Sequence, residues 1–449
     1  SPLCGRNFEY FSEDPFLAGR LGAAYVSAAQ GEDVAVSLKH FAANNQETNR
    51  QTANSQVDER ALREIYLSAF EYVVKTARPA TIMASYNRLN GYYACENRHL
   101  LTEILREEWG FDGVVISDWG ACADLAKAVK AGMDLEMPDS HGIHARKLKA
   151  ALKAGEISEE DIAKAAGRIE KLVKKYAPDN RAKKDTSDAH EIAKQLACES
   201  AVLLKNDGVL PLDTAKKIAF IGPYTNNHEI KSSWSFTGDS KDCVTIQEAA
   251  EKVFDASRTT YAEGCPVIGN DVELIGFTET TPKKYSEEEL AAMEQSALQA
   301  AKEADLVVMP MGEHYLQSGE ATSRAMIDVP EIQMELFHKV LAVNPNVVVV
   351  LFNGRPLDLR EISAKAKAIL EVWFPGTEGG SAVVDVLNGK KNPSGHLPMS
   401  FPYCVGQAPV SYNEYSTGRP NLPGMKERFR SKYLDIPNAP LYPFGYGLS

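Results

Sequence analysis

The spacing of apolar and polar positions changes repeatedly along residues 1–176, and this pattern predicts helices and strands in alternation. Helices are predicted at residues 14–30, 58–75, 98–109, 124–131 and 158–176. Short apolar runs predict strands at residues 34–39, 80–85, 113–117 and 132–136. Alternating strands and helices are typical of a parallel sheet or a (β/α) barrel. A complete eight-stranded barrel takes about 250 residues, so we expect a partial barrel that lacks its first strands.

A second alternating region begins after a polar segment at residues 177–187, which we interpret as a linker. From residue 188 to 449 the pattern predicts strands at 217–221, 259–262, 305–311, 347–352 and 368–373. It predicts helices at 245–256, 286–304, 330–344 and 379–387. The strands at 305–311 and 347–352 are apolar on both faces, as strands covered by helices on both sides should be. This region is therefore expected to be a doubly wound α/β sandwich domain, with ligands beyond the carboxyl ends of its strands.

Composition narrows the classes of partner. Acidic residues number 61 against 49 basic residues, which gives a net charge of −12 and argues against nucleic acid and anionic membrane surfaces as partners. No run of 18 apolar residues is present, so no membrane span is expected. Seven cysteines without metal-ligand spacing favour unpaired thiols and a cytoplasmic, reducing compartment. The chain opens without an initiator methionine, and we expect it to be a piece of a longer protein.

Cofactor signals are weak. No glycine-rich phosphate loop is found, so no nucleotide cofactor is expected. The loop at residues 139–144 has two histidines and one aspartate, but such loops are usually solvated, so no metal is expected.

Polar and aromatic residues follow three of the predicted strands in the first region. They are Lys39 and His40, Tyr86 and Asn87, and Asp118 and Trp119. Barrel enzymes place their chemistry at the carboxyl ends of the strands, so we expect these side chains to share one mouth. Such a group can bind many hydroxyls and stack an indole on a sugar face. The pattern therefore indicates a site for a small carbohydrate.

Several segments resemble glycoside hydrolase family 3, in its β-glucosidase branch. They are residues 39–50 (KHFAANNQETNR), 117–121 (SDWGA), 132–138 (GMDLEMP), 5–15 (GRNFEYFSEDP) and 442–449 (YPFGYGLS). The resemblance covers essentially the whole chain. It implies a retaining, exo-acting β-glycosidase that releases glucose from the non-reducing end of β-glucosides or cello-oligosaccharides through a covalent glycosyl-enzyme.

The resemblance also implies roles for individual residues. Asp118 would be the nucleophile, and Glu320, in segment 311–324 of the second region, would be the acid/base, with Glu313 as its alternative. The residues implied to contact the sugar are Arg6, Lys39, His40, Arg50, Tyr86 and Trp119. Nearby cations should keep Asp118 ionised, whereas desolvation should raise the pKa of Glu320. Retention requires the two carboxyl groups to be about 5–5.5 Å apart.

The chain also departs from the family pattern. The family's early strands, with an aspartate that grips the sugar, should precede Arg6, and a fibronectin-like domain often follows the final motif. One alternative is therefore a non-catalytic or inactive remnant that only binds sugars, or that needs a second chain. Another is a β-xylosidase. A β-N-acetylhexosaminidase of the same family is disfavoured because residues 39–41 (KHF) are followed by residues 42–45 (AANN). That relative instead carries its acid/base as a histidine–aspartate pair on a barrel loop. The oligomeric state is left open, with a homo-oligomer as one alternative.

Overall fold

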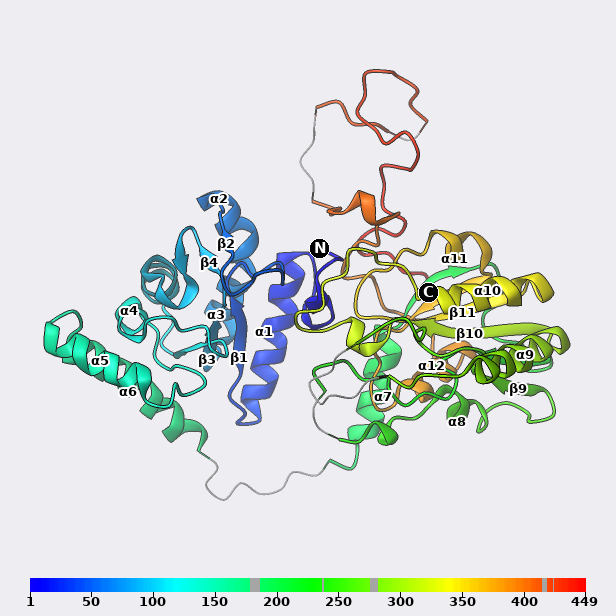
Figure 1. Ribbon diagram of the computed structural model, residues 1–449, viewed down its shortest axis with the longest axis horizontal. Coiled ribbons are helices and arrows are strands. Elements are labelled where there is room, and N and C mark those ends of the chain that lie inside the picture. Colours follow the sequence, from blue (N-terminus) through cyan, green and yellow to red (C-terminus); the bar gives the residue numbers. More distant parts are fainter. Residues whose placement is uncertain (178–185, 236–237, 275–281, 414–417, 423) are drawn as a thin grey trace. The chain divides into compact units, whose positions relative to one another are not determined.

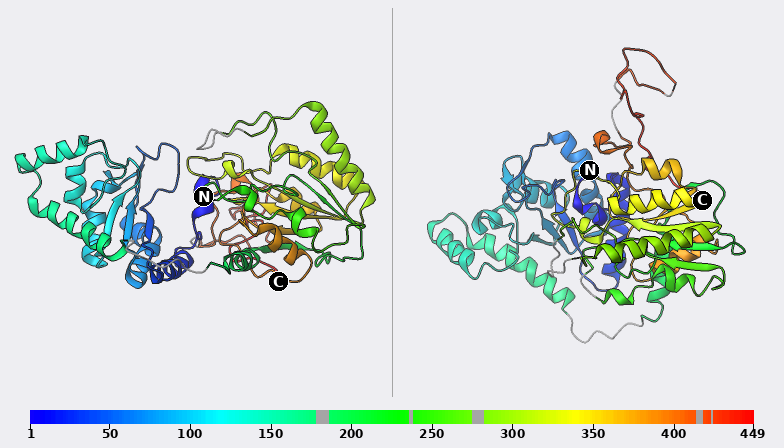
Figure 2. Two further views of the ribbon diagram at one scale, coloured as in Figure 1. Left: turned by 90° about the horizontal axis from the view of Figure 1, so that it is seen from below. Right: turned by 45° about the vertical axis from the view of Figure 1, so that its right-hand side comes forward.

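The computed structural model describes residues 1–177, 186–235, 238–274, 282–413, 418–422 and 424–449. The chain forms two compact units (Figures 1 and 2). We call Tyr10–Lys183 the barrel unit, and Ser1–Glu9 together with Lys184–Ser449 the sandwich unit. The prediction had assigned residues 1–9 to the barrel domain. Of the predicted linker, residues 178–185 lie outside the described residues.

The barrel unit is built on three parallel strands in the order β1-β3-β6. Their bounds are β1 Ser37–Phe41, β3 Thr81–Ala84 and β6 Val114–Ser117. Residues 132–136, predicted as a strand, contribute a single parallel bridge between Leu135 and Ile116. Strand β1 begins three residues later than predicted, and its pairing with β3 begins at Ser37. The predicted partial (β/α) barrel is confirmed.

One helix precedes these strands and the others follow them. They are α1 Pro15–Gly31, α2 Glu59–Ala61, α3 Ser68–Ala77, α4 Leu125–Ala131, α5 Ile143–Ala154 and α6 Glu159–Tyr176, with π-helical segments at Leu62–Tyr66 and His99–Glu108. Four of these helices start at side-chain caps, because Asp14, Asp58, Asp124 and Ser158 accept hydrogen bonds from backbone amides of the first turn. A small sheet of β2 (Asn54–Ser55), β4 (Arg88–Leu89) and β5 (Tyr92–Tyr93) was not predicted, nor was α5.

The sandwich unit contains a six-stranded sheet in the order β7-β12-β11-β10-β8-β9. The strands are β7 Val202–Asn206, β8 Ile218–Ile221, β9 Thr259–Ala262, β10 Leu306–Gly312, β11 Val347–Phe352 and β12 Ala368–Glu371. All neighbours pair in parallel except the edge strand β7, which runs antiparallel to β12.

Helices cover both faces of this sheet (Figure 1). Helices α7 (Ala189–Ser200), α8 (Ile246–Ala250) and α12 (Gly379–Leu387) pack on one face, and α9 (Glu287–Glu303), α10 (Glu331–Val343) and α11 (Arg360–Lys365) on the other. Alternate residues of β11 point into the two cores, so Val348 and Val350 belong to one and Val347 and Val349 to the other. The doubly wound prediction is confirmed. Among the described helices, none has the length and apolar character needed to cross a bilayer.

Candidate active site

The carboxyl ends of the parallel strands position the predicted sugar-site residues of the barrel unit. Strand β1 carries Lys39 and His40, Tyr86 lies two residues beyond β3, and Asp118 directly follows β6. Because the strands pair in register from Ser37 to Thr81 to Val114, their ends meet at one edge of the sheet.

Asp118 is held in a defined orientation by its neighbours. The backbone N–H of Trp119 donates a hydrogen bond to Oδ1 of Asp118 at 2.7 Å. On the other oxygen, His40 Nε2 lies 3.7 Å from Oδ2. The Asp118 side chain is 11% exposed and that of His40 is 3% exposed. The carboxylate is therefore largely shielded from solvent, yet one part of it stays accessible to a ligand.

Arg50, Tyr86 and Trp119 extend this cluster. The Arg50 guanidinium lies 4.5 Å from the centre of the Tyr86 ring, and Tyr86 Oη donates a hydrogen bond to the carbonyl of Trp119 at 3.1 Å. The Trp119 residue itself is 63% exposed, as a surface for sugar stacking must be. Lys39 is also exposed and precedes His40 on β1. Contacts therefore link Asp118, His40, Tyr86, Trp119 and Arg50 into one group.

Sequence reasoning missed Glu47. Its buried carboxylate accepts a hydrogen bond from Arg50 Nη1 at 2.7 Å and fixes the guanidinium against Tyr86. The spacing of three residues between Glu47 and Arg50 within one motif was the available signal. The Lys39–His40 and Phe41–Ala42 peptide bonds of the same segment are cis.

The predicted acid/base residue lies in the sandwich unit, in the loop that follows β10. The Glu320 side chain is 13% exposed, and Arg6 Nη1 lies 3.8 Å from its Oε1. Arg6 is almost fully buried, and it also contacts Glu9. Its guanidinium lies 6.0 Å from the Trp234 ring. Arg6 therefore belongs to the surroundings of Glu320 within the sandwich unit.

Arg355 anchors the loop that carries Glu320. Its Nε donates to Glu313 Oε1 at 2.8 Å, and its Nη2 donates to the carbonyls of Thr322 (3.0 Å) and Gln317. Its Nη1 donates to the carbonyl of Leu3 at 3.2 Å. One buried guanidinium thereby joins both ends of the loop to the first residues of the chain. This contact explains why residues 1–9 belong to the sandwich unit.

Glu313 is the counter-ion of this anchor. Its side chain is 0% exposed, and it accepts hydrogen bonds from Arg355 and, at 3.1 Å, from Arg324 Nη1. Burial lowers the pKa of Arg355, whereas the charge of Glu313 raises it. Nothing in the spacing of the sequence linked Arg355 to the loop.

Two further contacts shape the same loop. Gln333 binds the backbone of Gly312 on both sides, accepting from its N–H at 2.7 Å and donating to its carbonyl at 2.8 Å. Burial lowers the pKa of His314 to about 4, so the ring is neutral near pH 7. Its Nδ1 accepts a hydrogen bond from the N–H of Leu316 at 3.2 Å, as a neutral imidazole can.

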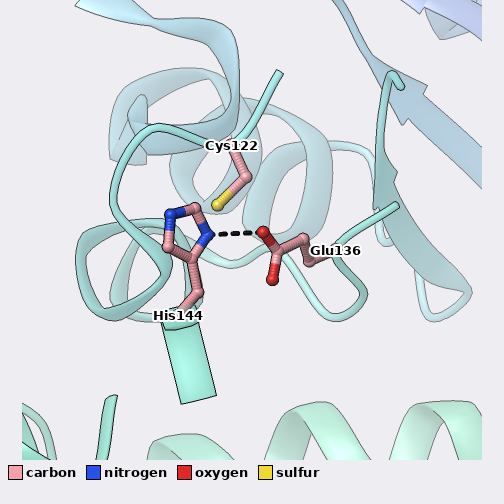
Figure 3. A group of neighbouring side chains, drawn as sticks. All are labelled: Cys122, Glu136 and His144. Atoms are coloured by element: carbon pink, nitrogen blue, oxygen red, sulfur yellow. Dashed lines mark hydrogen bonds and ion pairs between the residues drawn. The ribbon is translucent and has the colours of Figure 1, made fainter. Parts of the chain in front are cut away.

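Among the described residues, one group combines metal-ligating side chains at short range. Cys122, Glu136 and His144 of the barrel unit place one ligand atom each within 4.8 Å of one another (Figure 3). The predicted metal-free loop at 139–144 contributes one of these residues, His144, at the start of α5.

Comparison with known proteins identifies the family. The model of the Glycosyl hydrolase family 3 C-terminal domain matches residues 201–449, and that of the Glycosyl hydrolase family 3 N terminal domain matches residues 1–172. The chain belongs to glycosyl hydrolase family 3. The predicted family is thereby confirmed.

Curated members of the family align along the whole chain. A thermostable beta-glucosidase B of Acetivibrio thermocellus is 41% identical, and an exo-alpha-(1->6)-L-arabinopyranosidase of Bifidobacterium longum is 39% identical. Each alignment covers 100% of this chain and 58% of the relative, so the chain spans little more than half the length of these relatives.

Solved structures of the family have a similar fold. A beta-glucosidase from Listeria innocua in complex with isofagomine has a TM-score of 0.88 and 34% identity. A GH3 beta-glucosidase from Bifidobacterium adolescentis has a TM-score of 0.83 and 36% identity. Both comparisons cover 100% of this chain and 64% of the solved chain.

Proposed function

We propose that this family 3 chain carries the catalytic residues of a retaining, exo-acting β-glucosidase. The observation that supports this most strongly is the linked group of Asp118, His40, Tyr86, Trp119 and Arg50 at the carboxyl ends of parallel strands. Its carboxylate is oriented by a backbone amide, and an exposed indole stands beside it. Relatives and solved neighbours named beta-glucosidase support the choice of substrate class.

In the proposed first step, a carboxylate oxygen of Asp118 attacks the anomeric carbon of the terminal glucose. Glu320 donates its proton to the departing glycosidic oxygen, and a covalent glycosyl-enzyme remains. In the second step, Glu320 removes a proton from water, and that water displaces Asp118 from the anomeric carbon. The two carboxyl groups must come within about 5–5.5 Å for this double displacement.

The sugar-binding side chains divide into two sets. Lys39, His40 and Arg50 would donate hydrogen bonds to the hydroxyls of the terminal sugar, and Trp119 would stack on its apolar face. Tyr86 fixes the backbone of Trp119 through its hydroxyl. Arg6, at 3.8 Å from Glu320, would bind on the acid/base side and keep the Glu320 side chain oriented.

Glu313 is the weaker choice as acid/base. Its side chain is fully buried and forms ion pairs with Arg355 and Arg324. Protonation of Glu313, which an acid/base residue requires, would break both ion pairs. Glu320 retains partial exposure, as a group that touches substrate requires. We therefore propose that Glu320 is the acid/base and that Glu313 positions the loop.

Hydrolysis of p-nitrophenyl β-glucoside by the full chain tests the proposal. Wild type, Asp118→Ala and Glu320→Ala are compared, with Asp112→Ala, which removes an exposed carboxylate before β6, as the control. Asp118→Ala should fall to background. Glu320→Ala should lose activity, and added azide should restore part of it as β-glucosyl azide, because p-nitrophenolate leaves with little acid assistance.

Two further substrates distinguish the alternatives. The β-xyloside and the α-L-arabinopyranoside are assayed in parallel, since one relative is named for the second activity. A preference for either would replace the glucoside assignment and leave the retaining chemistry intact. If the folded wild type hydrolyses none of these substrates but binds glucose, the chain is a sugar-binding remnant and the catalytic proposal fails for it.

A further inference from the structure

Three side chains from three separate segments of the barrel unit converge (Figure 3). Cys122 lies in the loop after β6, Glu136 follows the Leu135 bridge, and His144 is the second residue of α5. Figure 3 shows the sulfur, the carboxylate and the imidazole pointing toward one another. None of the three residues belongs to the sugar-binding group around Asp118.

The chemistry of the three donors suits a borderline divalent ion. Thiolate sulfur, imidazole nitrogen and carboxylate oxygen are the ligand types that zinc takes in proteins, at about 2.0–2.3 Å. Tetrahedral coordination at those lengths separates neighbouring ligand atoms by about 3.4–3.7 Å. The donors here already lie within 4.8 Å of one another, so side-chain movements of about 1 Å would bring them to bonding distance.

The surroundings favour a built site over a surface coincidence. Cys122 is buried, and the side chains of Glu136 and His144 are only 14% and 16% exposed. Glu136 Oε1 and His144 Nδ1 face each other across one hydrogen bond, so a bound cation could replace the proton between them. The N–H of His144 donates to Ser140 Oγ at 3.0 Å and fixes the start of the helix.

We propose that Cys122, Glu136 and His144 bind one zinc-class divalent ion, with water completing the coordination. The carboxylate and imidazole would bind directly, and the Cys122 thiol would lose its proton to solvent as the metal–sulfur bond forms. Cys122 lies in the loop that begins with Asp118 and Trp119, and Gly120 N–H donates to the Met137 carbonyl at 2.7 Å. The ion would therefore link the loop after β6, which carries Cys122, to the loop after the Leu135 bridge, which carries Glu136.

Cobalt(II) titration of the reduced, metal-stripped full chain tests this site without reference to catalysis. Wild type should bind one cobalt ion per chain and develop sulfur-to-cobalt charge-transfer absorption in the near ultraviolet, which zinc should abolish by displacement. In Cys122→Ser the charge-transfer band should disappear, and affinity should fall at least about 100-fold. His144→Gln should weaken binding similarly but retain a sulfur band at high cobalt.

Two control variants match the chemistry removed. Cys404→Ser removes the half-buried thiol of the sandwich unit, and His141→Asn removes the neighbouring loop imidazole; both should bind cobalt within about twofold of wild type. Circular dichroism establishes that each variant is folded, and His144→Gln decides the question if Cys122→Ser is not. No saturable binding by wild type, or an unchanged sulfur band in folded Cys122→Ser, would overturn the proposal, as would loss of binding in His141→Asn alone.

Discussion

Replacing Arg355 by methionine should destabilise the sandwich unit by about 3 kcal/mol. Methionine fills much of the same space but removes every donor that Arg355 directs to Glu313, Leu3 and Thr322. The Glu313 carboxylate would stay fully buried, with Arg324 at 3.1 Å as its remaining cation. Breaking a buried ion pair costs about 3–5 kcal/mol, and the surviving contact with Arg324 places the expected loss at the lower end of that range.

Differential scanning calorimetry measures this loss. For domains of 150–250 residues, 1 kcal/mol corresponds to about 2–4 °C in Tm, so the Arg355→Met transition should move down by about 6–12 °C. Arg360→Met is the matched control, because its half-exposed guanidinium binds Asp358 at the surface. Exposed pairs contribute about 0–1 kcal/mol, so the control should shift by at most a few degrees. Equal shifts in the two variants would refute the anchoring argument.

The same variant tests whether the anchor serves Glu320. If Arg355 positions the acid/base loop, Arg355→Met should lose more activity on cellobiose, whose leaving group needs a proton, than on p-nitrophenyl β-glucoside. A uniform loss on both substrates would indicate destabilisation without a positioning effect. Arg360→Met again supplies the comparison, since Arg360 contacts no part of that loop in the described structure.

Three other perturbations have definite expected outcomes. Burial raises the pKa of Glu371 well above its usual value, so the folded protein favours the neutral carboxyl. The stability that this group contributes is fully present below the unfolded pKa of about 4.3 and declines as pH rises. The Tm of Glu371→Gln minus that of wild type should therefore grow from pH 5 to pH 8, and a constant difference would contradict this reasoning. Gly312→Ala should unfold the loop or the sheet edge, because Gly312 has φ of 146° and its Cβ would lie 1.9 Å from the Phe352 carbonyl oxygen; a Tm within 2 °C of wild type, about half a kcal/mol, would show that the backbone relaxes. Iodoacetamide followed by peptide mass spectrometry should label the partly exposed Cys404 first, whereas the buried Cys265, whose pKa burial raises to about 12, should react only after unfolding; equal rates would contradict the burial pattern.

The helices and strands could be predicted where a local pattern of apolar or capping residues determines the structure. Strand β11 has the predicted bounds, because an uninterrupted apolar run is typical of a strand covered by helices on both faces. Helix α12 also has the predicted bounds. Ser158 marked the start of α6 through its capping box with Asp161. Helix α5 escaped prediction because its first turn carries histidine and no side-chain cap, and the preceding loop looked solvated.

The candidate site could be predicted only in part. Motif order brought Asp118, His40 and Trp119 to one sheet edge, since parallel strands end together. Contacts between distant segments carried no sequence signal, so the pairing of Arg355 with Glu313, 42 residues earlier, had to be observed. Arg6 was predicted as a sugar ligand, and its place beside Glu320 depends on the packing of the first nine residues, which no local pattern encodes.

The sandwich unit is formed by two separate segments of the chain, and this affects the order in which it can fold during synthesis. Leu3 receives its hydrogen bond from Arg355, 352 residues later in the chain, so residues 1–9 leave the ribosome long before this partner is made. At about 5–20 residues per second, that interval is roughly 20–70 s. The barrel unit, continuous from Tyr10 to Lys183, can fold during the wait. Residues 1–9 would therefore join the sandwich unit only after the sheet strands that precede Arg355 have been made.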